Sequence, residues 1–192
     1  MSGVQTCALP ISELGYEAGA TILVSTGGCS RRKGTQPLIR AFAAANAAGG
    51  ARLHILGGGP LYEQCRSLGA PGVVLHGFVD DVIPHLQAAD LFVSASRSEG
   101  MPLAVLEALS CGLPALLSTI APHEDVAGLL ADQGCVECFD AADEGSMRRA
   151  LAAALDGAGP ARPADVSALS SAVMARRYAQ AYRALARRGG RA

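Results

Sequence analysis

The chain has 192 residues, of which 50% are hydrophobic and 17% charged, and its formal net charge is −1 at pH 7. This length suffices for a domain with a hydrophobic core that needs no disulfide or metal to hold it. The near-neutral balance gives no electrostatic footprint for nucleic acid or an anionic membrane. No apolar run approaches the ~20 residues of a membrane span, and the first residues lack the basic and apolar regions of a secretory signal.

The first eleven residues stand apart from the rest of the chain. Residues 3–11 read GVQTCALPI, which resembles the translation of a common short-read sequencing adapter in one frame. We expect residues 1–11 to be such an artefact rather than an ordinary flexible extension, and we exclude them from the fold. On this expectation the chain is a fragment whose native N-terminal part is missing.

From residue 12 onward, short apolar runs alternate with longer segments of helical spacing. The runs predict strands at 21–26, 52–56, 73–76, 91–95, 114–118 and 135–138. The segments between them predict helices at 35–48, 61–68, 82–88, 102–111, 124–130 and 144–155. Runs apolar on both faces that alternate with helices are typical of a parallel sheet covered on both sides. The sequence therefore predicts an α/β domain over residues 12–160, built on a doubly wound parallel sheet.

The C-terminal part has a different composition. Residues 157–164 are rich in Gly, Ala and Pro and predict a linker, and residues 166–188 predict a last helix. Residues 161–192 are thus expected to form the linker and C-terminal helix. The arginines of this helix are expected on a solvated face rather than in a binding patch.

Six cysteines are spaced irregularly along the chain. We expect them to be reduced, as in a cytosolic protein, because a chain of this size needs no disulfides. Cys135 and Cys138 have CxxC spacing, but neither a second pair nor a histidine at zinc-finger distance accompanies them. We therefore expect no metal or redox role for this pair.

Three expected strand-to-helix turns are unusual, and ligands bind at the carboxyl ends of the strands in such sheets. The first turn runs from Thr26 to Gly34, is rich in glycine, and places Lys33 just before a helix. Its backbone N–H groups, the helix dipole and the ammonium group would together favour a phosphate. The alternative is a surface lysine beside a turn, and the spacing is not that of a Walker A loop.

The second turn contains Gly57, Gly58 and Gly59, followed by Pro60. Tyr62 stands where a dinucleotide-binding GxGxxG motif has its third glycine, so the match to that motif is weak. We expect instead a tight turn that keeps side chains out of a crevice.

The third turn, residues 98–107, reads SEGMPLAVLE and follows the strand at 91–95. Glu99 falls on the loop at the carboxyl end of that strand, and Pro102 suits the first turn of a helix. Glu107 falls in a helix that its neighbours make apolar nearly all round, where an unpaired carboxylate would be costly. Either Glu107 lies on the one exposed strip of that helix, or it accepts hydrogen bonds from the hydroxyl groups of a ligand.

These turns belong to an ordered set of motifs: Gly27…Lys33-Gly34, GGGP at 57–60, HGFV at 76–79, Ala89-Asp90 and SEGMPLAVLEALSCGLP at 98–114. The set resembles the C-terminal domain of the family 4 retaining glycosyltransferases, which have the GT-B fold and Rossmann-like domains. The resemblance runs from Ser12 to the final helix. It implies a nucleotide-sugar donor, UDP- or GDP-linked, as substrate, with no metal or other cofactor. It also implies transfer with retention to a sugar or lipid-linked acceptor, such as a glycolipid or growing polysaccharide.

The resemblance also implies roles for individual residues. Lys33 and Glu99 would be the catalytic residues: Lys33 would hold the diphosphate and stabilise the leaving group, and Glu99 would bind the transferred sugar. Glu107 would bind the ribose hydroxyls, so the two glutamates would not form the acid–nucleophile pair of a glycosidase. The implied donor-binding residues are Gly27, Gly28, Lys33, Val79, Glu99, Gly100, Met101, Leu103 and Glu107.

The chain departs from the family pattern at several positions. Gly28 stands where many members have arginine, so Arg31 or Arg32 would have to compensate. Ala95 replaces a frequent proline and Pro102 a frequent glycine. Residues 119–123 lack the usual double glycine, although His123 and Asp125 would occupy the rim of the site. The other three histidines, His54, His76 and His85, are expected in core or surface roles.

The GT-B architecture has a second, N-terminal domain that supplies the acceptor site, and the motifs above do not include it. We therefore expect little or no transferase activity from this chain alone, and any membrane association of the cytoplasmic protein would reside in that other half. Two further classes stay open. Gly28 suggests an inert nucleotide-sugar-binding module, and a GT-B sugar-nucleotide epimerase suits the SEGMPLAVLE pattern less well.

Overall fold

The computed structural model describes residues 14–163, 165–170, 172, 173, 175, 176, 179, 180 and 183. The expected adapter-derived segment, residues 1–11, lies outside these described residues, and so does Cys7. Among the described residues, no helix has both the length and the apolar character needed to cross a bilayer.

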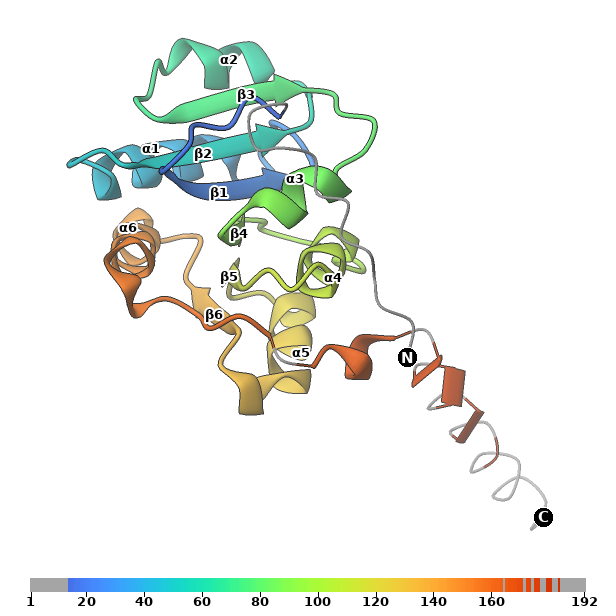
Figure 1. The fold of residues 1–192 in the computed structure, drawn as a ribbon. Helices are drawn as coiled ribbons and strands as arrows, with labels where there is room; N and C mark the ends of the chain where they lie inside the picture. The colour runs from blue at the N-terminus through green and yellow to red at the C-terminus, as the bar shows by residue number, and fades with distance from the viewer. Residues whose placement is uncertain are drawn as a thin grey trace.

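A single parallel sheet forms the centre of the molecule, with the strand order β3-β2-β1-β4-β5-β6 (Figure 1). The strands are β1 (Thr21–Thr26), β2 (Ala51–Leu56), β3 (Val73–Gly77), β4 (Leu91–Ser94), β5 (Ala115–Ser118) and β6 (Val136–Phe139). Every neighbouring pair is parallel, as expected for strands joined by helical crossovers. The predicted doubly wound sheet is confirmed, and each predicted strand end lies within one residue of the observed one.

In the part of the chain that the structure describes, six bounded α-helices connect or follow the strands. They are α1 (Thr35–Ala45), α2 (Tyr62–Ser67), α3 (Ile83–Ala88), α4 (Leu103–Ser110), α5 (Ala121–Leu129) and α6 (Glu144–Ala153). A short 3₁₀ helix, η1 (Ala131–Gln133), precedes β6, and a π-helical turn, η2 (Ala154–Ala158), follows α6. Helix α5 begins three residues before the predicted start at Glu124, because Pro122 falls in its first turn, where a proline is tolerated.

The helices cover both faces of the sheet, and each face has its own hydrophobic core. One core packs α1, α2 and α6 on the sheet and includes Leu23, Phe42 and Leu151. The other packs α3, α4 and α5 and includes Val24 and Leu109. Leu23 and Val24 are neighbours in β1 that face opposite cores, which explains why the strands read as apolar on both sides.

The strand order reverses direction between β1 and β4. The chain runs from β1 outward through β2 to β3, then crosses back through α3 to β4 on the other side of β1. The loops that leave β1 and β4 therefore turn to opposite faces of the sheet and open a crevice at its carboxyl edge. This is the place where open α/β sheets bind their ligands.

The C-terminal segment differs from the prediction. The expected linker is fixed to the domain, because Ala161 N donates to the Gly134 carbonyl (2.9 Å) and the Arg162 guanidinium donates to the carbonyls of Gly112 and Ala89 (both 3.3 Å). A 3₁₀ turn, η3 (Ser167–Leu169), follows and ends at an extended residue. The prediction of a helix from residue 166 is therefore wrong at its start, and helical backbone is found at the described residues from 172 onward.

Candidate functional site

Two glycines allow the loop after β1 to approach its neighbours closely. Gly34 has φ +62°, and a Cβ atom there would lie 2.2 Å from the Ala95 carbonyl oxygen, in the loop after β4. Gly28 has φ +79°, and its Cβ would lie 2.0 Å from the Gly58 carbonyl oxygen, in the turn after β2. Both positions require glycine for conformation and for space. The loops of three strands thus meet main chain to main chain at the carboxyl edge.

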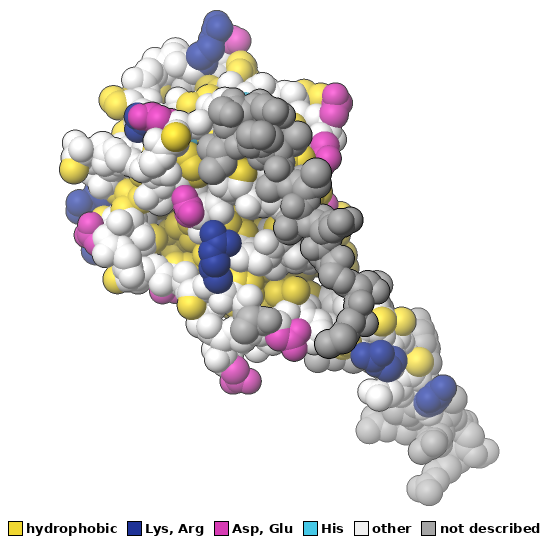
Figure 2. Space-filling model, viewed as in Figure 1, with side chains coloured by type: hydrophobic (Ala, Val, Ile, Leu, Met, Phe, Trp, Pro, Cys, Tyr) yellow, Lys and Arg dark blue, Asp and Glu magenta, His cyan; other side chains and the backbone are white. Residues whose placement is uncertain are grey.

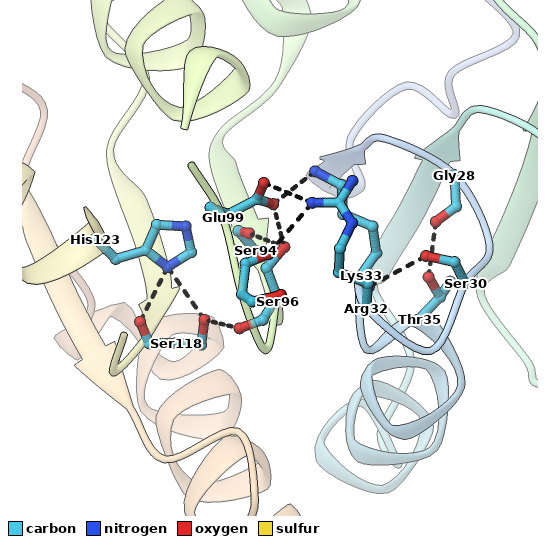
Figure 3. Close-up of polar contacts among 11 residues, drawn as sticks. Gly28, Ser30, Arg32, Lys33, Thr35, Ser94, Ser96, Glu99, Ser118 and His123 are labelled. Atoms are coloured by element: carbon cyan, nitrogen blue, oxygen red, sulfur yellow. Dashed lines mark hydrogen bonds and ion pairs between the residues drawn. The ribbon is translucent and has the colours of Figure 1, made fainter. Parts of the chain in front are cut away.

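This approach brings the predicted catalytic pair into contact (Figure 3). Lys33 Nζ lies 2.7 Å from Glu99 Oε1, and Arg32 Nη1 lies 2.8 Å from Glu99 Oε2. Ser96 Oγ donates a third hydrogen bond to Glu99 Oε1, at 2.7 Å. Burial alone would raise the pKa of Glu99, but the hydrogen bonds from Lys33 and Ser96 and the nearby positive charge hold that pKa below its usual range. Glu99 is therefore an anion with fixed orientation at neutral pH.

A row of buried polar groups continues from Glu99 towards β5. Ser118 Oγ, at the end of β5, donates to the Ser96 carbonyl oxygen at 2.5 Å. His123 Nδ1, from the first turn of α5, lies 3.1 Å from Ser118 Oγ and 3.0 Å from the Ser118 carbonyl oxygen. The His123 side chain is 0% exposed, so its predicted position at the rim is wrong. Burial lowers the pKa of His123, which keeps the ring neutral.

Two cavities, each of about 280 Å³, open on either side of Thr26 at the end of β1. The first has a polar wall, and its lining includes Lys33, Glu99, Met101, Leu103, Glu107 and His123. The second has glycine and apolar walls, and its lining includes Gly27, Gly28, Gly57, Gly58, Phe78 and Val79. Of the predicted donor-binding residues, only Gly100 lines neither of these two cavities.

Helix α4 is less buried than its sequence suggests. Val105, Ala108 and Leu109 face the core, but Leu103 is 59% exposed and Glu107 is also exposed. The expectation that this helix is buried nearly all round is therefore wrong. Glu107 lies on the exposed strip of the helix, as the first alternative predicted, and it also lines the polar cavity; its binding of ligand hydroxyl groups stays a prediction. Its charge needs no buried partner.

The structure also explains why position 28 is glycine and which residue supplies a second cation to the site. An arginine does not fit at position 28 of this backbone, because even a Cβ atom would overlap the Gly58 carbonyl. The second cation of the site comes instead from Arg32, which reaches Glu99 and also donates to the Ser98 carbonyl oxygen at 3.2 Å. The sequence offered two candidates, Arg31 and Arg32, and Arg32 is the one that lies beside Lys33 and Glu99 (Figure 3).

Outside the crevice, the described charged side chains show no comparable cluster on the visible face of the molecule. On the face drawn in Figure 2, basic and acidic side chains are interspersed. Within the described part of the chain, no three His, Cys, Asp or Glu side chains are placed to hold a metal ion. Cys135 lies just before β6 and is buried, whereas Cys138 lies within β6, an edge strand of the sheet, and is exposed.

The fold and the site define an α/β domain of the Rossmann-like class with a polar ligand crevice at its switch point. Residues 20–151, more than half of the chain, match the family model of the glycosyl transferases group 1. The chain belongs to this family, and its predicted membership and GT-B-type fold are confirmed.

One relative and two solved structures illustrate the similarity. The chain is 32% identical to LpsE, a lipopolysaccharide core biosynthesis glycosyltransferase of Rhizobium meliloti (strain 1021), over 71% of this chain and 42% of that protein. WaaG, a glycosyltransferase involved in lipopolysaccharide biosynthesis, has a similar fold (TM-score 0.65, 24% identity, 76% of this chain and 40% of WaaG). So does the pneumococcal O-GlcNAc transferase GtfA, solved with UDP and GlcNAc (TM-score 0.59, 19% identity, 70% of this chain and 28% of GtfA). The chain spans less than half the length of each.

Proposed function

We propose that residues 12–160 form the donor-binding domain of a retaining glycosyltransferase and bind a UDP- or GDP-linked sugar. The observation that carries this proposal is the contact between Lys33 and Glu99 in the polar cavity, which shares Thr26 with the second cavity. A nucleotide sugar has two uncharged ends, a nucleoside and a sugar, with a doubly charged diphosphate between them. In this proposal the second cavity holds the base, and the polar cavity, which shares Thr26 with it, holds the ribose hydroxyls, the diphosphate beside Lys33 and the sugar.

In this arrangement the diphosphate lies along the glycine turn and beside Lys33. The ammonium group has three N–H donors, of which Glu99 takes one, so two remain for phosphate oxygens. When the bond between the sugar C1 and the diphosphate oxygen breaks, negative charge grows on the leaving diphosphate. Lys33, assisted by Arg32, stabilises that charge in the transition state more than in the ground state.

The two glutamates bind hydroxyl groups at different places on the donor. Glu99 accepts three hydrogen bonds from the protein, and a carboxylate has about four lone-pair positions, so one is left for a sugar hydroxyl. Glu107, which is exposed and lines the same cavity, binds the ribose hydroxyls. The base lies against Val79 and the exposed ring of Phe78 in the second cavity.

The acceptor is a glycolipid or growing polysaccharide. This part of the proposal rests on the printed descriptions of relatives, LpsE in lipopolysaccharide core biosynthesis and an O-antigen chain mannosyltransferase of Escherichia coli. We also propose a cytoplasmic location, because the irregular cysteine spacing is unlike the disulfide framework of a secreted protein. By the same proposal, the chain binds donor by itself but transfers sugar only together with an N-terminal acceptor domain.

Calorimetric titration of the 192-residue chain with UDP, GDP and a panel of UDP- and GDP-sugars tests the donor site. We expect binding that is weakened at least tenfold in Lys33→Ala and in Glu107→Ala, since each removes a charged hydrogen-bonding partner. Arg149→Ala is the matched control, because Arg149 is an exposed cation on α6 that pairs with Asp143 instead. The absence of binding for every nucleotide and nucleotide sugar would refute the proposal.

A further inference from the structure

His123 has one ring nitrogen whose role the proposed function does not explain. The side chain is 0% exposed, yet Nε2 has no hydrogen-bond partner within the part of the chain that the structure describes. A buried polar atom without a partner costs free energy, and native proteins rarely leave one without a reason. His123 also lines the polar cavity that contains Lys33 and Glu99.

The hydrogen bonds around the other ring nitrogen determine what Nε2 can do. Ser118 Oγ donates its proton to the Ser96 carbonyl oxygen, so towards His123 it can only accept. The Ser118 carbonyl oxygen is also an acceptor. Nδ1 faces two acceptors and must carry the proton, which leaves Nε2 of the neutral ring with a lone pair. His123, one of the residues that line the cavity, therefore has an unused hydrogen-bond acceptor at Nε2.

The surroundings of Nε2 favour a neutral hydroxyl group as its partner. In Figure 3 the second nitrogen of the His123 ring points away from Ser118, in the direction of the Glu99 carboxylate. Thr26, at the end of β1, lines the same cavity, and its Oγ1 likewise has no partner among the described residues. An acceptor nitrogen, a hydroxyl and a carboxylate around one cavity match the donors and acceptors of a sugar ring better than those of a phosphate.

We propose that His123 Nε2 accepts a hydrogen bond from a hydroxyl group of the donor's sugar and so selects sugars that carry a hydroxyl at that position. The inference rests on the proposed function, because it places the sugar in the cavity of Glu99 and Lys33. A sugar that lacks this hydroxyl leaves Nε2 buried and unpaired, which is the strongest form of discrimination that a single polar contact gives. His123 thus contacts the sugar but not the nucleotide, so it contributes to sugar specificity and not to nucleotide affinity.

Two variants separate this role from a structural one. His123→Asn keeps a donor near the Nδ1 position for the Ser118 carbonyl and removes Nε2. His123→Gln places an amide oxygen near the Nε2 position and restores an acceptor to the cavity wall. Both are compared with the unchanged chain by calorimetry, using UDP, GDP and the UDP- or GDP-sugar that the chain binds best.

We expect His123→Asn to weaken binding of the nucleotide sugar about tenfold, with His123→Gln recovering part of the loss. Affinity for the nucleotide alone should stay within about twofold in both variants. Unchanged nucleotide-sugar affinity in His123→Asn, or an equal loss for the nucleotide alone, would overturn the inference. If nothing binds the unchanged chain, the proposed function fails first, and the two failures are distinguishable.

Monodeoxy forms of the best-bound sugar give an independent measurement. The unchanged chain should bind one deoxy sugar about tenfold more weakly than its parent. In His123→Asn that difference should vanish, since the two changes remove the same hydrogen bond and are not additive. Equal discrimination in both proteins would overturn the inference. Should His123→Asn fail to fold, as judged by circular dichroism, His123→Ala, which also lacks the Nε2 acceptor, takes its place in the same cycle.

Discussion

Acidification should destabilise this domain through a buried histidine on β2. His54 is 1% exposed, its Nδ1 lies 2.8 Å from His76 Nε2, and its ring centroid is 4.0 Å from that of Tyr16. Burial, followed by the positive charges that His76, His85 and Arg52 contribute, lowers the pKa of His54 to about 4. The folded state therefore resists protonation of this ring, whereas the unfolded chain does not.

The sign and size of the effect follow from proton linkage. Because the folded pKa lies below the unfolded value of about 6.5, stability is complete above about pH 6.5 and is lost as the pH falls towards 4. At pH 5 the ring of His54 is protonated in about 97% of unfolded molecules and about 9% of folded ones. Between about pH 7.5 and pH 5, this difference lowers the free energy of unfolding by about 2 kcal/mol. His76 and His85 act in the same direction, since burial lowers their pKa values too.

Urea denaturation followed by circular dichroism at both pH values measures this loss. His54→Asn is the informative variant, because its amide can still meet His76 Nε2 but does not titrate. The variant will be less stable at neutral pH, yet its loss between about pH 7.5 and pH 5 should be smaller than that of the unchanged chain by about 2 kcal/mol. An equal loss in the two proteins would refute the reasoning.

Two further predictions concern the loop after β1. Gly28→Ala should destabilise the fold by about 2 kcal/mol or more, because its Cβ would overlap the Gly58 carbonyl. Gly49→Ala is the control: Gly49 has φ +76° but no atom within 4 Å of its would-be Cβ, so this variant should lose only the conformational cost of about 1 kcal/mol. Equal losses of unfolding free energy in the two variants, measured by urea denaturation, would contradict the close approach of Gly28 to Gly58. Arg32→Ala should weaken UDP or GDP binding three- to tenfold. The effect should be smaller than for a buried cation, because the Arg32 side chain is 55% exposed and its charge is screened by solvent. Arg31→Ala should change little in the same titration, and the reverse order would contradict the assignment of the second cation.

The strands could be predicted well because their signal is local. A run such as 21–26 is apolar on both sides, and this pattern is sufficient to identify a central strand of a covered parallel sheet. The exposure of α4 could not be predicted in this way. Leu103 is apolar but 59% exposed, since it stands where the helix begins at the carboxyl edge rather than over the sheet. Residue type alone does not distinguish these two positions.

The pairing of side chains across loops was harder still to predict. The sequence motif indicated that Lys33 and Glu99 belong to one site, but not that Arg32 shares the same carboxylate. That contact depends on the turn at Gly34, which brings the loops after β1 and β4 together. The burial of His123 depends on β5 placing Ser118 beside Ser96, a register between strands that no local pattern encodes. The signal available in the sequence was only a histidine near the carboxyl end of a strand.

The main-chain contacts at Gly28 and Gly34 bear on how this site can change over time. Because three loops contact one another through backbone atoms at these glycines, the relative placement of the loops does not depend on exposed side chains around the crevice. Phe78, Met101 and Leu103 are all well exposed around it and support no core packing of their own. Substitutions at these three positions can therefore alter which molecule is bound without a loss of stability. The backbone contacts that position the loops are thus separate from the exposed side chains around the crevice, so new ligand specificities can arise by single substitutions that act independently.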